Sequence, residues 1–144
     1  IDMRARQALW EAGLDYGHRT GHGVGCYLSV HEYAAYISLR DTLPFKPGML
    51  ISNEPGYYKR GAFGIRTESL LLVQERGAME DGRKLLGFDT VTLAPIDTRP
   101  VVKALLAPAE RRWLNDYHEC VRDTIGPLVE APVRKWLGKA CAPI

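Results

Sequence analysis

Residues 63–73 read Phe-Gly-Ile-Arg-Thr-Glu-Ser-Leu-Leu-Leu-Val and show the clearest strand pattern in this 144-residue chain. In an extended strand, alternate side chains point to opposite faces. One face would carry Phe63, Ile65, Thr67, Ser69, Leu71 and Val73. Arg66 and Glu68 would share the other face. The pattern predicts a single strand with two opposite charges side by side.

Further strands are expected on both sides of this stretch. Residues 49–52 follow the turn signal Pro47-Gly48 and form a short apolar run that should end at Glu54-Pro55-Gly56. Residues 74–84 are polar and contain glycine, which predicts a hairpin loop, and residues 89–96 alternate as a returning strand. We therefore expect an antiparallel pair.

Helical patterns lie at both ends of the chain. Asp2 is placed as an N-cap and Gly13 as a C-terminal stop, with small and apolar residues at helical spacing between them. The four glycines over residues 17–25 favour a loop that enters a strand. After Pro100 the apolar period becomes 3.6, which predicts two short helices broken near Gly126.

These elements predict an α+β fold with an antiparallel sheet and a C-terminal helical tail. We expect residues 1–98 to form the sheet-bearing unit. Residues 99–144 are expected to form a helical extension that packs on this unit or on a dimer partner.

Composition narrows the classes of function. Charged residues make up 25% of the chain and the net charge is +2, which argues against a nucleic-acid partner. No apolar run is long enough for a membrane span, so no membrane partner is expected. Cys26, Cys120 and Cys141 are odd in number and lack C-x-x-C spacing, which favours a reducing compartment, the cytoplasm. Because the chain begins with Ile1, we expect it to be part of a longer protein.

Three residues are of the types that divalent cations prefer, namely His22, Glu54 and Glu68. Glu54 precedes a proline, which favours an extended backbone at the end of the predicted strand. Glu68 lies in an otherwise apolar strand, where an unpaired carboxylate would be costly. Each also has a structural interpretation: Glu68 could pair with Arg66, Glu54 could cap a turn, and His22 could be an ordinary loop histidine.

Other motifs fail on inspection. His31-Glu32 begins like the H-E-x-x-H zinc helix, but Ala35 stands at the second histidine position. The glycines around His22 lack the pattern of a nucleotide-phosphate loop. No serine lies in a G-x-S-x-G motif, so a covalent acyl-enzyme is not expected.

Several separated segments, in order, resemble aminopeptidase P of the pita-bread metallopeptidases. They are Asp15-Tyr-Gly-His-Arg-Thr-Gly-His-Gly-Val-Gly25, Val30-His-Glu32, Pro47-Gly-Met-Leu-Ile-Ser-Asn-Glu-Pro-Gly-Tyr-Tyr58, Phe63-Gly-Ile-Arg-Thr-Glu68, Leu93-Ala-Pro-Ile-Asp97 and Trp113-Leu-Asn-Asp-Tyr-His118. The resemblance covers nearly the whole chain. It implies the C-terminal half of a pita-bread catalytic domain that releases the N-terminal residue from peptides with proline in the second position.

The resemblance also implies roles for individual residues. His22, Glu54 and Glu68 would be metal ligands for two divalent ions, with Mn as the first candidate and Zn or Co as alternatives. His18 and His31 would be catalytic residues that bind the substrate and donate hydrogen bonds to its carbonyl and to the oxyanion. Glu54 could also accept the proton of the attacking water. Arg66 would border the substrate and hold the carboxylates in place.

The sequence departs from the family pattern in several places. The family site needs two upstream aspartates that this sequence does not contain, and Asp97 is interpreted as structural. We therefore expect the isolated chain to be catalytically impaired, with the missing upstream half as a partner. Smaller departures are Arg19 for glycine, Tyr33-Ala34 for Gly-Pro, and Ser69 for asparagine.

Two alternatives remain open. One is a prolidase-type dipeptidase with the same ligands, and the other is a catalytically silent pita-bread module that binds peptides or proteins. The large apolar residues of the tail, Trp113 and Trp136 among them, also make a homodimer possible.

Overall fold

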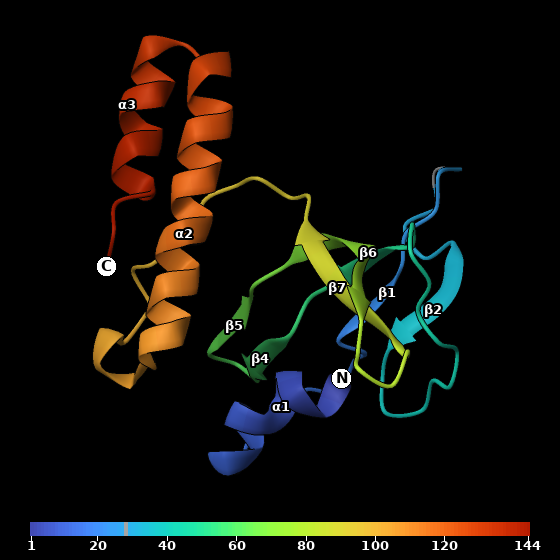
Figure 1. Cartoon of the computed structure of the whole chain (residues 1–144). Helices are drawn as coiled ribbons and strands as arrows, with labels where there is room; N and C mark the ends of the chain where they lie inside the picture. Colours follow the sequence, from blue (N-terminus) through green and yellow to red (C-terminus); the bar gives the residue numbers. More distant parts are fainter. Residues whose placement is uncertain (28) are drawn as a thin grey trace. The chain divides into compact units, whose positions relative to one another are not determined.

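The computed structural model describes residues 1–27 and 29–144 and divides into two compact units, Ile1–Thr92 and Leu93–Ile144 (Figure 1). The first unit contains one α-helix and the strands of the described residues, and the second contains α-helices of 18 and 10 residues. The predicted α+β class with an antiparallel sheet and a helical tail is confirmed. The sequence predicts a division after residue 98, and this division stays a prediction. The boundary between the two compact units of the structure lies between Thr92 and Leu93.

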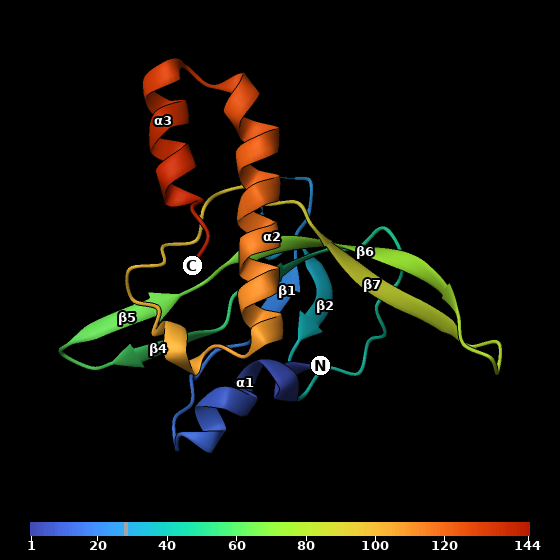
Figure 2. The same cartoon turned by 60° about the vertical axis from the view of Figure 1, so that its left-hand side comes forward.

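The first unit is built on a five-stranded sheet in the order β2-β1-β3-β6-β7. Its strands are β1 (Gly21–Gly23), β2 (Tyr33–Ile37), β3 (Leu50–Asn53), β6 (Ser69–Ala78) and β7 (Lys84–Thr90), and all neighbours are antiparallel. Figure 2 shows β6 and β7 as a long twisted ribbon. The core consists of Ala35, Ile37, Met49, Ile51 and Val73, with Phe45 packed against it.

The single strand predicted over residues 63–73 is wrong, because the chain changes partner in the middle of it. β5 (Phe63–Arg66) pairs with β4 (Gly56–Lys59) in a separate two-stranded ribbon, whereas β6 begins at Ser69 and pairs with β3. Side-chain alternation continues across such a change, so the pattern alone does not reveal it. The two links between ribbon and sheet, residues 54–55 and 67–68, each carry a glutamate.

The returning strand is antiparallel as predicted but lies earlier in the sequence than residues 89–96. β6 extends to Ala78, inside the predicted loop, and β7 pairs with it. Beyond Thr92 the chain belongs to the second unit, where the Ala94 carbonyl accepts a hydrogen bond from the Tyr117 hydroxyl at 2.8 Å. Leu93 and Ile96 therefore pack against the core of the helical unit and do not belong to a strand. β2 and β4 were not predicted.

Helix α1 (Asp2–Glu11) ends just before Gly13, which has a positive φ of 71°, as the stop signal predicted. The N-cap assignment of Asp2 is wrong. Asp2 is the first helical residue, is buried, and accepts a hydrogen bond from the Arg6 Nε at 2.8 Å. The Asp2 carboxylate is thus paired with Arg6 in the next turn and does not cap the helix.

The second unit is a helical hairpin. A short helix η1 (Lys103–Leu105) precedes α2 (Pro108–Ile125), which is joined by η2 (Gly126–Leu128) to α3 (Ala131–Ala140). Figures 1 and 2 both show α2 and α3 side by side. The predicted break near Gly126 is confirmed, since Pro127 cannot continue the hydrogen bonding of a helix. Tyr117, Val121, Leu137 and Cys141 form its core.

His118 is a buried polar group within this hairpin. Its Nε2 accepts a hydrogen bond from the Ile96 backbone N–H at 3.0 Å, so this nitrogen carries no proton. Its Nδ1 has no hydrogen-bond partner among the described residues. Burial lowers the pKa of His118 below its ordinary 6.5.

A histidine whose folded pKa is lowered stabilises the fold above its unfolded pKa, and this stability is lost as the pH falls through the folded value. We expect the melting temperature of the helical hairpin, followed by far-ultraviolet circular dichroism, to fall as the pH drops below 6.5. His118→Gln keeps an acceptor for Ile96 without a titrating group, so its melting temperature should depend less on pH in this range. Equal pH dependence in both proteins would contradict this explanation.

Candidate metal and substrate site

The site depends on a close approach of β1 to β3. A Cβ added at Gly21 would lie 1.9 Å from the carbonyl oxygen of Ser52, so glycine is required there. The next residue, His22, donates its backbone N–H to the Ser52 Oγ at 3.0 Å. The Ser52 hydroxyl in turn donates to the Glu54 Oε1 at 2.9 Å. One serine thus joins the backbone of His22 to the carboxylate of Glu54.

His22 is held in a defined orientation. Its Nδ1 lies 2.9 Å from the Gly23 carbonyl oxygen, and because a carbonyl only accepts, Nδ1 carries a proton. The Nε2 points at the Glu54 Oε1, 3.2 Å away, and both side chains are about nine-tenths buried. Two acceptor atoms face each other when the ring is neutral, so the pair requires a proton or a metal cation between them. Metal-binding histidines usually hold their second ring nitrogen on a carbonyl or carboxylate in this way.

Arg66 lies against both glutamates. Its Nη1 donates to the Glu54 Oε2 at 2.8 Å and lies 3.6 Å from the Glu68 Oε2. Both the expected support of the carboxylates by Arg66 and the alternative pairing of Glu68 with Arg66 are therefore present. Among the described residues, no three histidine, cysteine, aspartate or glutamate side chains are grouped closely enough to hold a metal. The Arg66 guanidinium instead contacts both Glu54 and Glu68.

His18 belongs to a directional chain of hydrogen bonds. Its Nδ1 lies 2.7 Å from the Arg19 carbonyl oxygen and must donate to it, and its Nε2 lies 3.1 Å from the Tyr58 hydroxyl. Arg66 Nε donates to the same hydroxyl at 2.8 Å. The Tyr58 proton is therefore directed to His18. The expected donation from Nε2 to a substrate is possible only when His18 is the imidazolium.

Tyr58 is a residue of the site that the sequence analysis missed. Its ring lies over two glycines of the ribbon, because a Cβ at Gly64 would lie 2.8 Å from the Tyr58 Cδ1 and one at Gly56 would lie 2.7 Å from its hydroxyl. The hydrogen bond to Tyr58 raises the pKa of Arg66, with the carboxylates of Glu54 and Glu68 as smaller contributions. A glycine directly opposite a tyrosine in a predicted hairpin would have been the available signal.

His31 is close to His22, with 4.0 Å between ring centroids. The neighbouring Glu32 accepts a hydrogen bond from the Tyr27 backbone N–H at 2.6 Å and braces the loop. Residue 31 lies in a turn and residues 33–37 form a strand, so the rejected zinc-helix motif is indeed not helical. His22 thus contacts both His31 and Glu54, and Glu54 in turn contacts Arg66.

Asp97 lies in the second unit and is exposed. It pairs with Arg99 at 2.6 Å, and hydrogen bonds from Arg99 lower the pKa of Asp97 to about 2. This pairing agrees with the structural role assigned to Asp97 from the sequence.

Comparisons with known proteins agree with the sequence resemblance. Residues 1–75 match Metallopeptidase family M24, and residues 84–144 match the C-terminal region of peptidase M24. Two curated relatives match all of this chain: a probable Xaa-Pro aminopeptidase P of Laccaria bicolor at 46% identity and aminopeptidase P2 of Arabidopsis thaliana at 44%. The chain covers 24% and 21% of their lengths.

A solved structure is also similar. The X-prolyl aminopeptidase of Caenorhabditis elegans, described as a cytosolic enzyme with a di-nuclear active site, superposes with a TM-score of 0.89 and 40% identity. The match covers 99% of this chain and 24% of that chain. The pita-bread fold expected from the sequence is therefore confirmed, and the chain spans about a quarter of the relatives it matches.

Gly21→Ala tests the close approach on which the site depends. Because the new methyl group would overlap the Ser52 carbonyl, we expect the free energy of unfolding to fall by about 1–3 kcal/mol in urea titrations. Gly17→Ala is the matched control, since a Cβ at that position meets nothing within 4 Å. Equal stabilities of the two variants would show that β1 and β3 can separate without cost.

Proposed function

Because the chain belongs to metallopeptidase family M24, we propose that it supplies part of the active site of a metal-dependent aminopeptidase. The reaction proposed is release of the N-terminal residue from peptides with proline in the second position. The observation that supports it most directly is the buried pair of His22 and Glu54, whose Nε2 and Oε1 face each other at 3.2 Å.

The donor set suits a divalent cation. His22 would bind through Nε2, since Nδ1 is engaged by the Gly23 carbonyl, and Glu54 would bind through its carboxylate. Glu68 would join them once its contact with Arg66 opens. Imidazole and carboxylate ligands are compatible with Mn, Zn or Co, and we propose two ions with Mn as the first candidate. When bound, such ions polarise a peptide carbonyl and make a water molecule more acidic.

The chain's own residues would orient the substrate and handle protons. Glu54 would accept the proton of the attacking water on its carboxylate. His18, as the imidazolium, would donate from Nε2 to a peptide carbonyl, and His31 would donate to the oxyanion beside His22. Arg66 would border the peptide and keep Glu54 oriented through the contact at 2.8 Å.

The remaining carboxylate ligands are proposed to come from a longer polypeptide, because the chain spans about a quarter of its relatives. A second candidate function has a specific observation in its favour. Arg66 already pairs with both Glu54 and Glu68, which favours a metal-free peptide-binding module. A prolidase-type dipeptidase would use the same residues and would differ in accepting dipeptides only.

A chimera tests the enzyme proposal. This chain would replace the matching quarter of the Caenorhabditis elegans enzyme, and hydrolysis of Xaa-Pro dipeptides and longer peptides would be measured with Mn present. We expect activity on peptides longer than two residues, and Glu54→Gln should lower kcat by about 10²-fold or more because a ligand and proton acceptor is lost.

Glu75→Gln is the control for this experiment, since Glu75 is an exposed partner of Lys84 in the hairpin of β6 and β7. A folded chimera that binds no metal and cleaves no peptide would leave the binding-module alternative. Cleavage restricted to dipeptides would identify the prolidase type instead.

We also propose that the chain works in the cytoplasm and self-associates through its second unit. The Caenorhabditis elegans relative is described as cytosolic, and no helix in the described parts of the chain is apolar and long enough to cross a membrane. For self-association the support is the exposed Trp113, 56% accessible and stacked on Tyr117 with ring centroids 5.6 Å apart.

Trp113→Ala should shift the monomer–dimer balance of the chain toward monomer in analytical ultracentrifugation. Trp10→Ala, which removes an exposed tryptophan from the first unit, is the control. An unchanged balance in Trp113→Ala would remove this proposal.

A further inference from the structure

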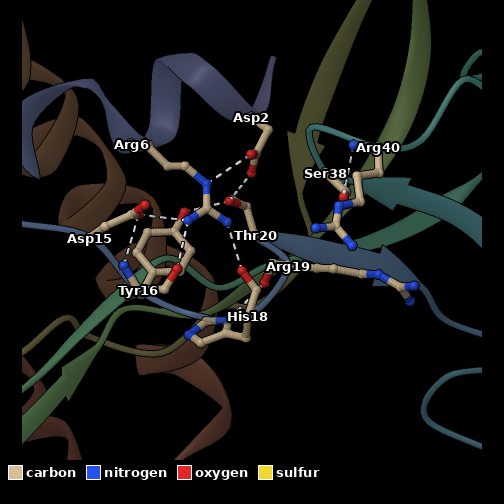
Figure 3. A network of polar contacts seen from close by, with 9 residues as sticks. All are labelled: Asp2, Arg6, Asp15, Tyr16, His18, Arg19, Thr20, Ser38 and Arg40. Carbon is tan, nitrogen blue, oxygen red and sulfur yellow. Dashed lines mark hydrogen bonds and ion pairs between the residues drawn. The ribbon is translucent and has the colours of Figure 1, made fainter. Parts of the chain in front are cut away.

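Arg6 is almost completely buried, with 7% of its surface exposed, and all three of its guanidinium nitrogens are engaged (Figure 3). Its Nε donates to Asp2 at 2.8 Å and its Nη1 to Asp15 at 2.7 Å. The same Nη1 donates to the Tyr16 carbonyl at 2.7 Å, and Nη2 donates to the His18 carbonyl at 2.6 Å. Two carboxylates thus pair with the guanidinium, and two carbonyls receive the remaining bonds.

The two carbonyls lie in a stretch that lacks other backbone support. Backbone-to-backbone hydrogen bonds are made at its ends, by Leu14 with Leu9 at 2.8 Å and by Thr20 with Ile37 at 3.0 Å. Between these points the described backbone is held by side chains: Arg6 binds the carbonyls of Tyr16 and His18, the Asp15 carboxylate accepts from the Tyr16 N–H at 2.8 Å, and the Arg19 carbonyl accepts from the His18 Nδ1 at 2.7 Å. A planar guanidinium fixes direction as well as distance, which a single ammonium group does not. The carbonyl directions at residues 16 and 18 are therefore set by this one side chain.

Arg6 also fixes the ring against which His18 packs. Its guanidinium lies 3.9 Å from the Tyr16 ring centroid, and the His18 ring lies 4.8 Å from that centroid. Tyr16 is buried and its hydroxyl is hydrogen bonded to Thr20. Two contacts therefore place the imidazole of His18. Arg6 binds the carbonyl of His18 itself, and Arg6 also packs on the Tyr16 ring that lies beside the imidazole.

We propose that Arg6 is a positioning residue that sets the orientation of the His18 imidazole from the opposite side of the backbone. This inference rests on the role proposed for His18 in substrate binding. Arg6 itself touches neither the metal ligands nor the reacting groups. Its loss moves His18 away from the Tyr58 hydroxyl while the pair of His22 and Glu54, held by Ser52, stays in place.

Histidine ring signals test this inference on the 144-residue chain without reference to activity. Long-range proton–nitrogen NMR spectra report which ring nitrogen carries the proton. In the native chain we expect His18 as the Nδ1–H tautomer, as its contact with the Arg19 carbonyl requires. In Arg6→Gln the His18 signals should move toward those of an exposed histidine with mixed tautomers, while His22 keeps its spectrum.

Three further variants separate positioning from general loss of stability. Arg6→Lys keeps the positive charge and should fold more readily than Arg6→Gln. It should still perturb His18, because one ammonium group cannot replace the several fixed donors of the planar guanidinium. Arg4→Gln removes an exposed charge from the same helix and should change nothing. Val73→Ala destabilises the core of the same unit and should leave His18 unchanged when recorded well below its melting temperature.

In the active chimera, Arg6→Lys should lower kcat/KM by about 10²-fold while metal content stays constant, as expected for a misplaced substrate-binding group. Unchanged His18 signals in both Arg6 variants would overturn the proposal, as would equal changes in Val73→Ala. An inactive native chimera would count against the proposed function alone, because the NMR comparison does not depend on it.

Discussion

Strand β1 comes so near to β3 at Gly21 that only a residue without a side chain fits against the Ser52 carbonyl. This contact fixes where β1 lies, and it places the backbone N–H of His22 on the Ser52 hydroxyl. The same hydroxyl orients Glu54, so the imidazole and the carboxylate meet in a buried place. Two facing acceptors in a dry environment attract a cation strongly, which is why the chemistry of the site follows from the approach of two strands.

A second constraint is the corner where the sheet gives way to the ribbon of β4 and β5. The chain leaves β3 through Glu54 and returns to β6 through Glu68, so both carboxylates lie at the exit and entry of the same ribbon. Arg66 at the end of β5 reaches both of them, and Tyr58 links Arg66 to His18. The polar residues of the site therefore form one connected network in which movement of Arg66 changes the charge balance of both glutamates.

Sequence reasoning selected residues that the structure brings into contact, His22, Glu54 and Arg66, but it missed some of their neighbours. The prediction of an antiparallel sheet and a broken helical tail is confirmed, because alternation, glycine and proline act locally. The break between β5 and β6 was missed, since a change of strand partner leaves alternation intact. Tyr58 was missed because its position depends on the lack of side chains at Gly56 and Gly64. The Tyr58 ring lies over these two glycines. The N-cap prediction for Asp2 is wrong because its carboxylate pairs with Arg6, one turn further along the helix.

The metal ligand set itself remains a proposal, and one measurement tests it most directly. Anomalous X-ray scattering from crystals of the chimera grown with Mn would locate the ions. The account predicts a peak beside the Nε2 of His22 and the carboxylate of Glu54, with the Nδ1 of His22 still donating to the Gly23 carbonyl. A peak elsewhere, or a direct His22–Glu54 contact that persists unchanged in the presence of Mn, would contradict it.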